Sequence, residues 1–325
     1  MNSAKPTKLW KKLAIPAALL ALSAGLLSRW PASRHATEAA RLGQASSAER
    51  LEAVIDQPGP LSVETLVGAD WQVPRSGLIN LKSTRAQAAG MKDGPEPIQI
   101  YAYAIRHPTQ GLFLVDTGAE RALSNDRDHA ALRGILAQAA HLDLLEVRTT
   151  TGAWLTAHDL VPSGVLLTHL HLDHVLGMPD IPGSVPVYAG PGESDERGLM
   201  NVFTQPVIDR ALGERGPIRQ WQFQPDPSGR FAGVLDVFGD GTLWALYVPG
   251  HTAGSTAYLA RTPKGPVLFT GDACHTAWGW EHGVEPGTFS DDQPMSAKSL
   301  RQLRDLVARH PSIDVRLGHQ ALAQR

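Results

Sequence analysis

The chain has 325 residues, with 30 Lys and Arg against 32 Asp and Glu, and a formal net charge of −2. Its 31 Gly and 24 Pro are spread along the chain without an internal repeat or a low-complexity tract. This composition excludes a fibrous or disordered protein and favours a loop-rich α/β enzyme. The single cysteine, Cys274, leaves no partner for an internal disulfide.

The first 30 residues form a basic leader with an apolar run. Lysines precede an Ala- and Leu-rich stretch over residues 13–27, which is typical of a signal peptide. Residues 13–30 also approach the length that spans a bilayer, with Trp10 and Trp30 near its ends, so an uncleaved membrane anchor is the alternative. Both alternatives predict export, either to the periplasm or to the outer face of the inner membrane. Residues 31–60 are predicted to be a linker and residues 61–325 the catalytic domain.

Without the leader, the chain is acidic. Residues 1–30 hold five Lys or Arg and no acid, which leaves 25 basic and 32 acidic side chains in residues 31–325, a formal charge of −7. A nucleic-acid partner favours a basic face, and no basic stripe is visible in the sequence. We therefore expect a small-molecule substrate and no nucleic acid; the sequence does not indicate an oligomeric state.

The densest group of potential metal ligands lies at the end of a predicted strand. The apolar run 165–167 suits a strand that is covered on both faces. His169 and His171 are two residues apart on extended chain, so they point to the same side and can bind one cation. Asp173 and His174 follow and can face a second cation from the same loop.

An amphipathic helix, or two, is predicted next along the chain. Apolar residues recur at near-helical spacing after the Gly- and Pro-rich residues 190–192: Met200, Val202, Phe203, Val207, Ile208 and Leu212. Such a helix either packs on the core or forms a lid that holds an acyl chain over the metals. Packing is the expected outcome, because apolar stripes are mostly core.

Three further strand-like runs each lead to a potential ligand. Residues 243–248 lead to His251, residues 266–270 to Asp272, and residues 313–317 to His319. Ligands gathered at strand ends are how an α/β scaffold builds a site from rigid elements and short loops. A structural helix over residues 295–310 is predicted to deliver the last of these strands.

These segments resemble the metallo-β-lactamase superfamily. The resemblance covers roughly residues 60–325 and is carried by residues 115–118, 168–174, 248–252, 270–272 and 318–319. It implies an α/β (α+β) fold, a four-layered αββα sandwich, with a dinuclear site along one edge of the two sheets.

The resemblance also implies a ligand set for two divalent metal ions, with zinc the expected metal. His169, His171 and His251 would hold the first ion and Asp173, His174 and His319 the second. Asp272 would bridge the two ions. Asp116 is expected to accept the free N–H of a ligand histidine, although a purely turn-forming Asp is the alternative.

The implied chemistry is hydrolysis. Two divalent cations about 3.5–4 Å apart give hydroxide near neutral pH from a shared water and polarise the oxygen of the group under attack. A metal-bridging hydroxide is therefore expected to attack the substrate carbonyl, with Asp173 steering its proton. The bridging Asp272 and the residues around it resemble the N-acyl-homoserine lactonase and organophosphate hydrolase branch, so a lactone or related ester is the predicted substrate.

The chain departs from the lactonases three residues beyond Asp272. Those enzymes have a tyrosine that contacts the substrate, and this chain has His275, which can donate the same hydrogen bond or act as the acid for the leaving alkoxide. A loop histidine bonded to backbone is the alternative. Cys274 is expected to be buried and not a ligand. Trp278 and Trp280 either wall a pocket or pack against neighbouring loops.

Other functions stay open at this point. A thioester or phosphotriester hydrolase of the same fold has the same ligands. A mononuclear-iron dioxygenase acting on persulfides needs only His169, His171 or His251, and Asp272, and the second set of ligands disfavours it. A non-catalytic scaffold is disfavoured because structural zinc sites are closed and usually richer in cysteine. Imidazole and carboxylate ligands also accept iron, manganese or cobalt.

Overall fold

The computed structural model describes residues 30–197 and 201–322. The predicted leader lies almost entirely outside these residues, so its cleavage or retention stays a prediction. Within the described part of the chain, no helix is both long enough and apolar enough to cross a membrane.

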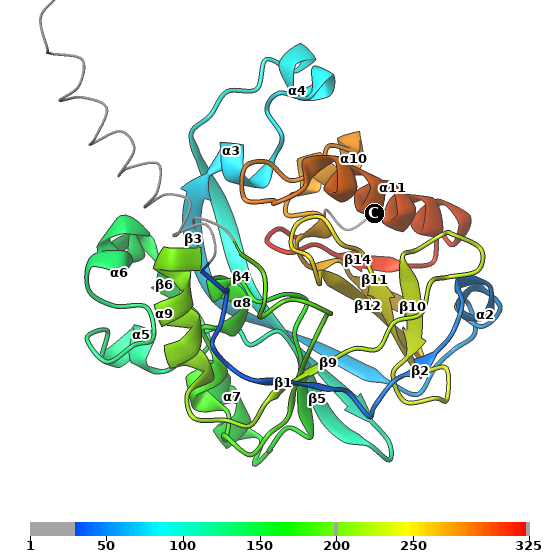
Figure 1. Cartoon of the computed structure of the whole chain (residues 1–325), viewed down its shortest axis with the longest axis horizontal. Helices are drawn as coiled ribbons and strands as arrows, with labels where there is room; N and C mark the ends of the chain where they lie inside the picture. The colour runs from blue at the N-terminus through cyan, green and yellow to red at the C-terminus, as the bar shows by residue number, and fades with distance from the viewer. Residues whose placement is uncertain (1–29, 198–200, 323–325) are drawn as a thin grey trace, which may run out of the picture.

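Two β-sheets form the centre of the molecule (Figure 1). The first has eight strands in the order β1-β9-β8-β7-β5-β4-β3-β6. Their bounds are Thr37–Ala39 (β1), Ser62–Pro74 (β3), Pro95–His107 (β4), Gly111–Val115 (β5), Glu146–Val147 (β6), Gly164–Leu166 (β7), Val187–Ala189 (β8) and Ile218–Gln220 (β9). The second has six strands in the order β14-β13-β12-β11-β10-β2. Their bounds are Gln44–Ala45 (β2), Gly233–Asp236 (β10), Leu243–Tyr247 (β11), Thr256–Thr262 (β12), Gly265–Phe269 (β13) and Asp314–Arg316 (β14).

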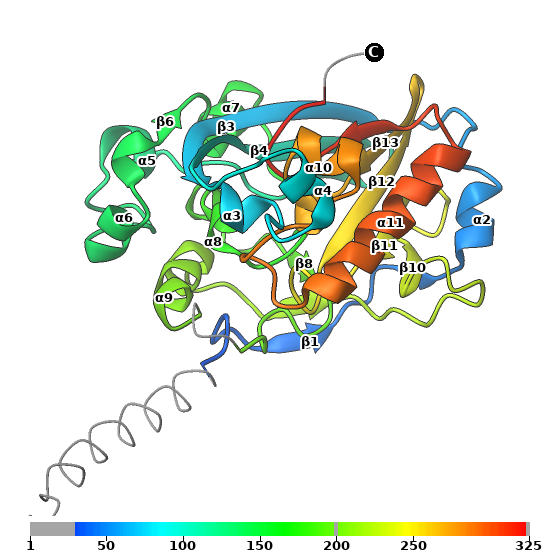
Figure 2. The same cartoon turned by 90° about the horizontal axis from the view of Figure 1, so that it is seen from above.

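Helices cover the outer face of each sheet (Figures 1 and 2). On the first sheet lie α5 (Ala122–Asn125), α6 (Ile135–Ala139), α7 (Thr151–Ala157), α8 (Leu172–Val175) and α9 (Asn201–Leu212). On the second lie α2 (Ala48–Glu52), α10 (Ala277–His282) and α11 (Gln293–Arg309). The short helices α3 (Arg75–Leu78) and α4 (Thr84–Ala88) follow β3, and single 3-10 turns cover Leu142–Leu144 (η1), Met178–Asp180 (η2) and Gly271–Ala273 (η3).

The apolar core has the layers of the predicted sandwich. A central cluster joins the two sheets through buried side chains such as Ile105, Leu166 and Phe269. A second cluster packs α7 and α9 on the first sheet, and a third packs α2 and α11 on the second. Burial of apolar surface in three separate layers requires elements on both faces of both sheets. The predicted αββα sandwich is therefore confirmed.

The elements that deliver the predicted ligands form where the sequence predicts them. The runs at 165–167, 243–248, 266–270 and 313–317 become β7, β11, β13 and β14. Helix α11 begins after Asp292, whose carboxylate accepts from the backbone N–H of Met295, and it ends before Pro311. Helix α9 packs as expected, because Val207 and Ile208 are buried in the core.

The segment 31–60 is not the linker that the sequence analysis assigned. It contributes β1 to an edge of the first sheet, where it runs parallel to β9, and β2 to an edge of the second. Helix α2 then buries Leu51 in the core of the second sheet. Because this segment pairs with both sheets, it belongs to the folded domain.

Candidate metal centre

The seven predicted ligands meet at one edge of the two sheets. Strands β11, β13 and β14 run in the same direction, because β12 is antiparallel to both β11 and β13 while β13 is parallel to β14. Their carboxyl ends therefore lie at the same edge, and the loops that follow them carry His251, Asp272 and His319. The loop and the short helix α8 after β7 bring the remaining ligands from the first sheet to this edge.

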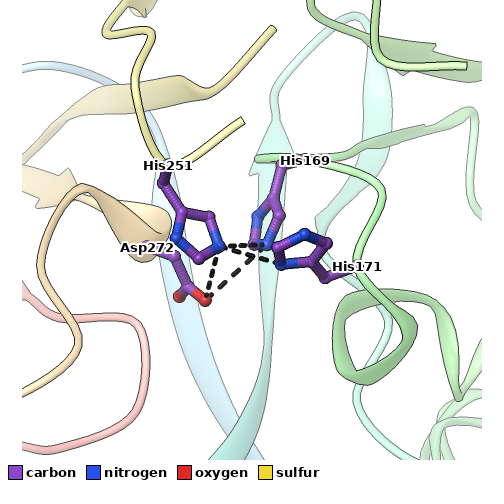
Figure 3. Close-up of side chains that lie close together, drawn as sticks. All are labelled: His169, His171, His251 and Asp272. Atoms are coloured by element: carbon purple, nitrogen blue, oxygen red, sulfur yellow. Dashed lines mark hydrogen bonds and ion pairs between the residues drawn. The ribbon is translucent and has the colours of Figure 1, made fainter. Parts of the chain in front are cut away.

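The first group consists of three histidines and Asp272 (Figure 3). The Nε2 atom of His251 lies 3.1 Å from His169 Nε2 and 2.9 Å from His171 Nδ1. The Oδ2 atom of Asp272 lies 3.4 Å from His251 Nε2 and 3.6 Å from His169 Nε2. All four potential ligand atoms lie within 4.8 Å of one another. Three imidazole nitrogens that converge in this way, with a carboxylate beside them, are a suitable donor set for a divalent cation.

The second group shares the same Asp272 oxygen. Asp272 Oδ2 lies 3.4 Å from His174 Nε2 and 3.3 Å from His319 Nε2, and Asp173 Oδ2 lies 3.2 Å from His319 Nε2. These four ligand atoms also lie within 4.8 Å of one another. The structure thus brings all seven residues together in the two groups that the family resemblance implies. One oxygen of Asp272 faces both groups.

Burial and mutual charge set the protonation of this cluster. Burial lowers the pKa of His169, His171 and His251, which favours the neutral imidazole that binds metals. Burial also opposes the charged form of His319, but the facing carboxylates of Asp272 and Asp173 raise its pKa to about 10. Protons therefore occupy part of the second group in the metal-free chain, and metal binding must release them.

Two further observations test whether the residues fit metal ions. The Nε2 atom of His174 and the Oδ1 atom of Asp272 are buried with no hydrogen-bond partner among the described residues. A buried polar atom without a partner is costly, and a bound cation satisfies it. A Cβ atom added to Gly318 would lie 2.2 Å from Asp272 Oδ1, so the chain leaves this carboxylate oxygen just enough room. The donor set and its surroundings fit two divalent ions.

Several ligands are held through their outer ring nitrogen. Asp116 accepts from His174 Nδ1 at 2.8 Å and from the backbone N–H of Thr168 at 2.8 Å, as the sequence analysis expects of this aspartate. Its φ of 55° lies in the left-handed region, which Asp tolerates better than most residues. His319 Nδ1 donates to the backbone carbonyl of Gln99 at 3.0 Å. Such contacts fix the tautomer and the ring orientation of a metal ligand.

His275 lies beside the cluster and is 1% exposed. Its Nδ1 donates to the backbone carbonyl of Leu78 at 3.0 Å, and its Nε2 lies 3.0 Å from Asp272 Oδ2. The side chain is therefore bonded to backbone and also faces the carboxylate shared by the two groups. The bond to backbone agrees with the loop-histidine alternative, and the contact of His275 with substrate stays a prediction.

Four other residues lie near the site but belong to neither ligand group among the described residues. Cys274 is buried in the core of the second sheet, outside both ligand groups, and burial raises the pKa of its thiol to about 12. Trp280 packs in the same core, and Trp278 stacks on His282 at a ring distance of 4.3 Å. Glu193, for which the sequence predicted no role, is 1% exposed and bonds to the loops of both sheets that carry the first group.

A comparison with protein families finds that residues 95–313 match the model of the metallo-β-lactamase superfamily. Among curated proteins, the chain is similar to the N-acyl homoserine lactonase AttM of Rhizobium johnstonii, with 31% identity over 160 residues, 49% of this chain and 58% of that protein. The same lactonase of Agrobacterium fabrum is 31% identical over 48% of this chain and 57% of that protein. The chain spans little more than half the length of these curated relatives.

The fold is also similar to solved structures. A quorum-quenching N-acyl homoserine lactone lactonase superposes with a TM-score of 0.57 and 17% identity, over 81% of this chain and 93% of that one. An N-acyl homoserine lactone hydrolase with N-hexanoyl-L-homoserine bound at its catalytic metal centre gives a TM-score of 0.56 at the same identity and coverage. At this identity the likeness shows the fold alone. From its sheets, its clustered ligands and the match over residues 95–313, the chain belongs to the metallo-β-lactamase superfamily.

Proposed function

We propose that this protein is a metal-dependent hydrolase with a dinuclear centre that opens a lactone or cleaves a related ester. The observation that carries the proposal is the position of Asp272 Oδ2, which lies in both groups of converging ligand atoms. The names of the curated relatives support a lactone as the substrate. When bound, two divalent ions supply Lewis acidity and a water of lowered pKa.

The exposure of the ligands indicates from which side a substrate approaches. Asp173 has a side chain that is 19% exposed, whereas the side chains of His169, His251, Asp272 and His319 are at most 3% exposed. His171 is also only partly buried. We therefore infer that the open side of the centre lies beside Asp173 and His171. A carboxylate at the open side can hold a water proton beside the reacting atoms, in addition to its place in the second group.

We propose that His275 is the acid that donates a proton to the leaving oxygen of the substrate. The bond to the Leu78 carbonyl fixes the proton on Nδ1, so only Nε2 can serve the site. Nε2 faces Asp272 at 3.0 Å, and a doubly protonated ring can donate there or to an oxygen that develops negative charge nearby. His275→Ala is expected to lower kcat with intact metal content, and unchanged catalytic efficiency would remove this role.

The test of the proposed function is proton release by the zinc-reconstituted protein with short- and long-chain N-acyl-homoserine lactones. Asp272→Asn serves as the blank, because it removes the charge of the shared carboxylate while keeping its shape. Turnover that the substitution abolishes supports the proposal. No turnover from a protein with two bound metals contradicts lactone hydrolysis and directs the assay to aryl esters, thioesters and phosphotriesters. Oxygen consumption with a persulfide would instead indicate the mononuclear-iron alternative.

We also propose that the protein is exported, on the basis of the basic and apolar leader in residues 1–30. Cell fractionation with antibody detection tests this, and a chain of full mass in the cytosol would contradict it. Retention of the leader would tether the domain to the membrane, and its removal would release it.

A further inference from the structure

The loop that follows β8 lies directly against the loop that carries His251. A Cβ atom added to Gly190 would lie 1.6 Å from the backbone oxygen of Gly254, and one added to Gly254 would lie 2.6 Å from Glu193 Cγ. Neither glycine can therefore gain a side chain without moving one loop away from the other. The two loops come from different sheets, since β8 belongs to the first and β11 to the second.

Glu193 uses this contact to bond with both ligand-bearing loops. Its Oε2 accepts from the backbone N–H of Leu170 at 2.7 Å, and Leu170 lies between His169 and His171. Its Oε1 accepts from the Thr252 hydroxyl at 2.5 Å and from the backbone N–H of Gly254 at 2.9 Å. Thr252 directly follows His251. A single carboxylate thus joins the two segments that supply the three histidines of the first group.

A carboxylate suits this position better than any other side chain. It only accepts hydrogen bonds, and here it meets three donors from two directions. An amide would place an NH₂ group against one of these donors, and an alkyl side chain would leave all three without a partner in a buried place. Burial raises the pKa of Glu193 to about 7, and a divalent cation nearby would favour its ionised form.

We infer that Glu193 is a positioning residue of the three-histidine group. It holds the His169 and His171 loop against the His251 loop, and in this way sets the affinity of that group for a divalent cation. The inference rests on the two-metal centre of the proposed function. Glu193 contacts the backbone beside the ligands, so its effect on the reaction passes through the histidines.

The experiment compares Glu193→Gln with Glu120→Gln in the full-length protein. Glu120 is a matched control because it is also buried, it also accepts from a backbone N–H, that of Ala131 at 2.7 Å, and its pKa is also raised to about 7. Zinc affinity is measured by competition with a chromophoric chelator. Cobalt is then substituted, and its visible spectrum reports the ligand geometry. Melting temperatures of all variants record the effect on the fold.

The expected result for Glu193→Gln is a loss of about 10- to 100-fold in affinity at one of two metal sites, with an altered cobalt spectrum. Glu120→Gln is expected to bind both ions as the unchanged protein does, whatever its melting temperature. If Glu193→Gln does not fold, Thr252→Val decides, since it removes one of the three donors and leaves the carboxylate in place. It is expected to weaken the same site to a smaller extent.

Two outcomes would overturn the inference, and they are distinguishable. Glu193→Gln or Thr252→Val with the affinity and cobalt spectrum of the unchanged protein would show that Glu193 does not position the ligands, and the proposed function would stand. If the protein without any substitution binds fewer than two ions, the two-metal centre itself is overturned, and the inference with it.

Discussion

Gly318 precedes His319 and lies against the carboxylate that both ligand groups share, so its replacement by alanine is a direct test of the centre. The added Cβ atom would lie 2.2 Å from Asp272 Oδ1 and 3.0 Å from the backbone oxygen of Gly271. An ordinary contact is 3.4 Å or longer. The Asp272 carboxylate must therefore move by about 1 Å, a misplacement that can cost about 100-fold in rate.

The assay for Gly318→Ala combines metal content, turnover and melting temperature. Turnover is expected to fall about 100-fold, and at least one metal ion is expected to bind more weakly. Gly216→Ala is the matched control, because no heavy atom lies within 4 Å of the Cβ atom it would add and its φ is not in the left-handed region. A Gly318→Ala protein with two tightly bound ions and full turnover would refute the assignment of Asp272 as the shared ligand.

Asp116→Asn places an amide NH₂ against either His174 Nδ1–H or the Thr168 N–H. Zinc affinity, measured by chelator competition, is therefore expected to fall about 10- to 100-fold. An affinity equal to that of the unsubstituted protein would contradict this prediction. Burial alone would raise the pKa of Glu52, but hydrogen bonds with Arg309 and His310 lower it from 4.5 to about 2. Because the pKa of Glu52 is lower in the folded chain than in the unfolded chain, its ionised carboxylate stabilises the fold above about pH 4.5. This contribution is lost as the pH falls toward 2. Glu52→Gln is therefore expected to reduce the free energy of unfolding by about 1 to 2 kcal/mol at pH 7 and by little near pH 2, and denaturant titrations at both pH values check this. Chelation of the metals is expected to lower the melting temperature, since ions at 100 times their Kd add about 2.7 kcal/mol to stability. Phe203 is 50% exposed on α9. Phe203→Ala is therefore expected to change the activity on long-chain and short-chain substrates equally. A selective loss of activity on long-chain substrates would indicate a lid.

The ligands could be predicted because their signal is local. Four ligands, at His169, His251, Asp272 and His319, lie within three residues of the end of an apolar run. Such runs become buried strands, as in β7. The spacing of His169, His171, Asp173 and His174 within one segment adds a second local signal. Neither signal depends on which strands are neighbours.

The contribution of residues 31–60 could not be predicted, for a physical reason. Strands β1 and β2 have three and two residues, all exposed, and such short edge strands show no alternation of polar and apolar side chains. Their pairing is decided by distant edges at β9 and β10. Glu193 was missed for a similar reason, because its three donors lie 23 to 61 residues away along the chain.

Neither ligand group is complete within one sheet, and this ties the chemistry to the fold. The first group takes His169 and His171 from the loop after β7 and adds His251 and Asp272 from the second sheet; the second group is divided in the same way. The distance between the sheets therefore sets the distance between ligands. Large side chains such as Tyr103 and Phe269, whose rings lie 4.6 Å apart in the central layer, keep that distance constant. Metal binding should in turn hold the sheets together, because an ion bound to residues of both sheets is lost when they separate.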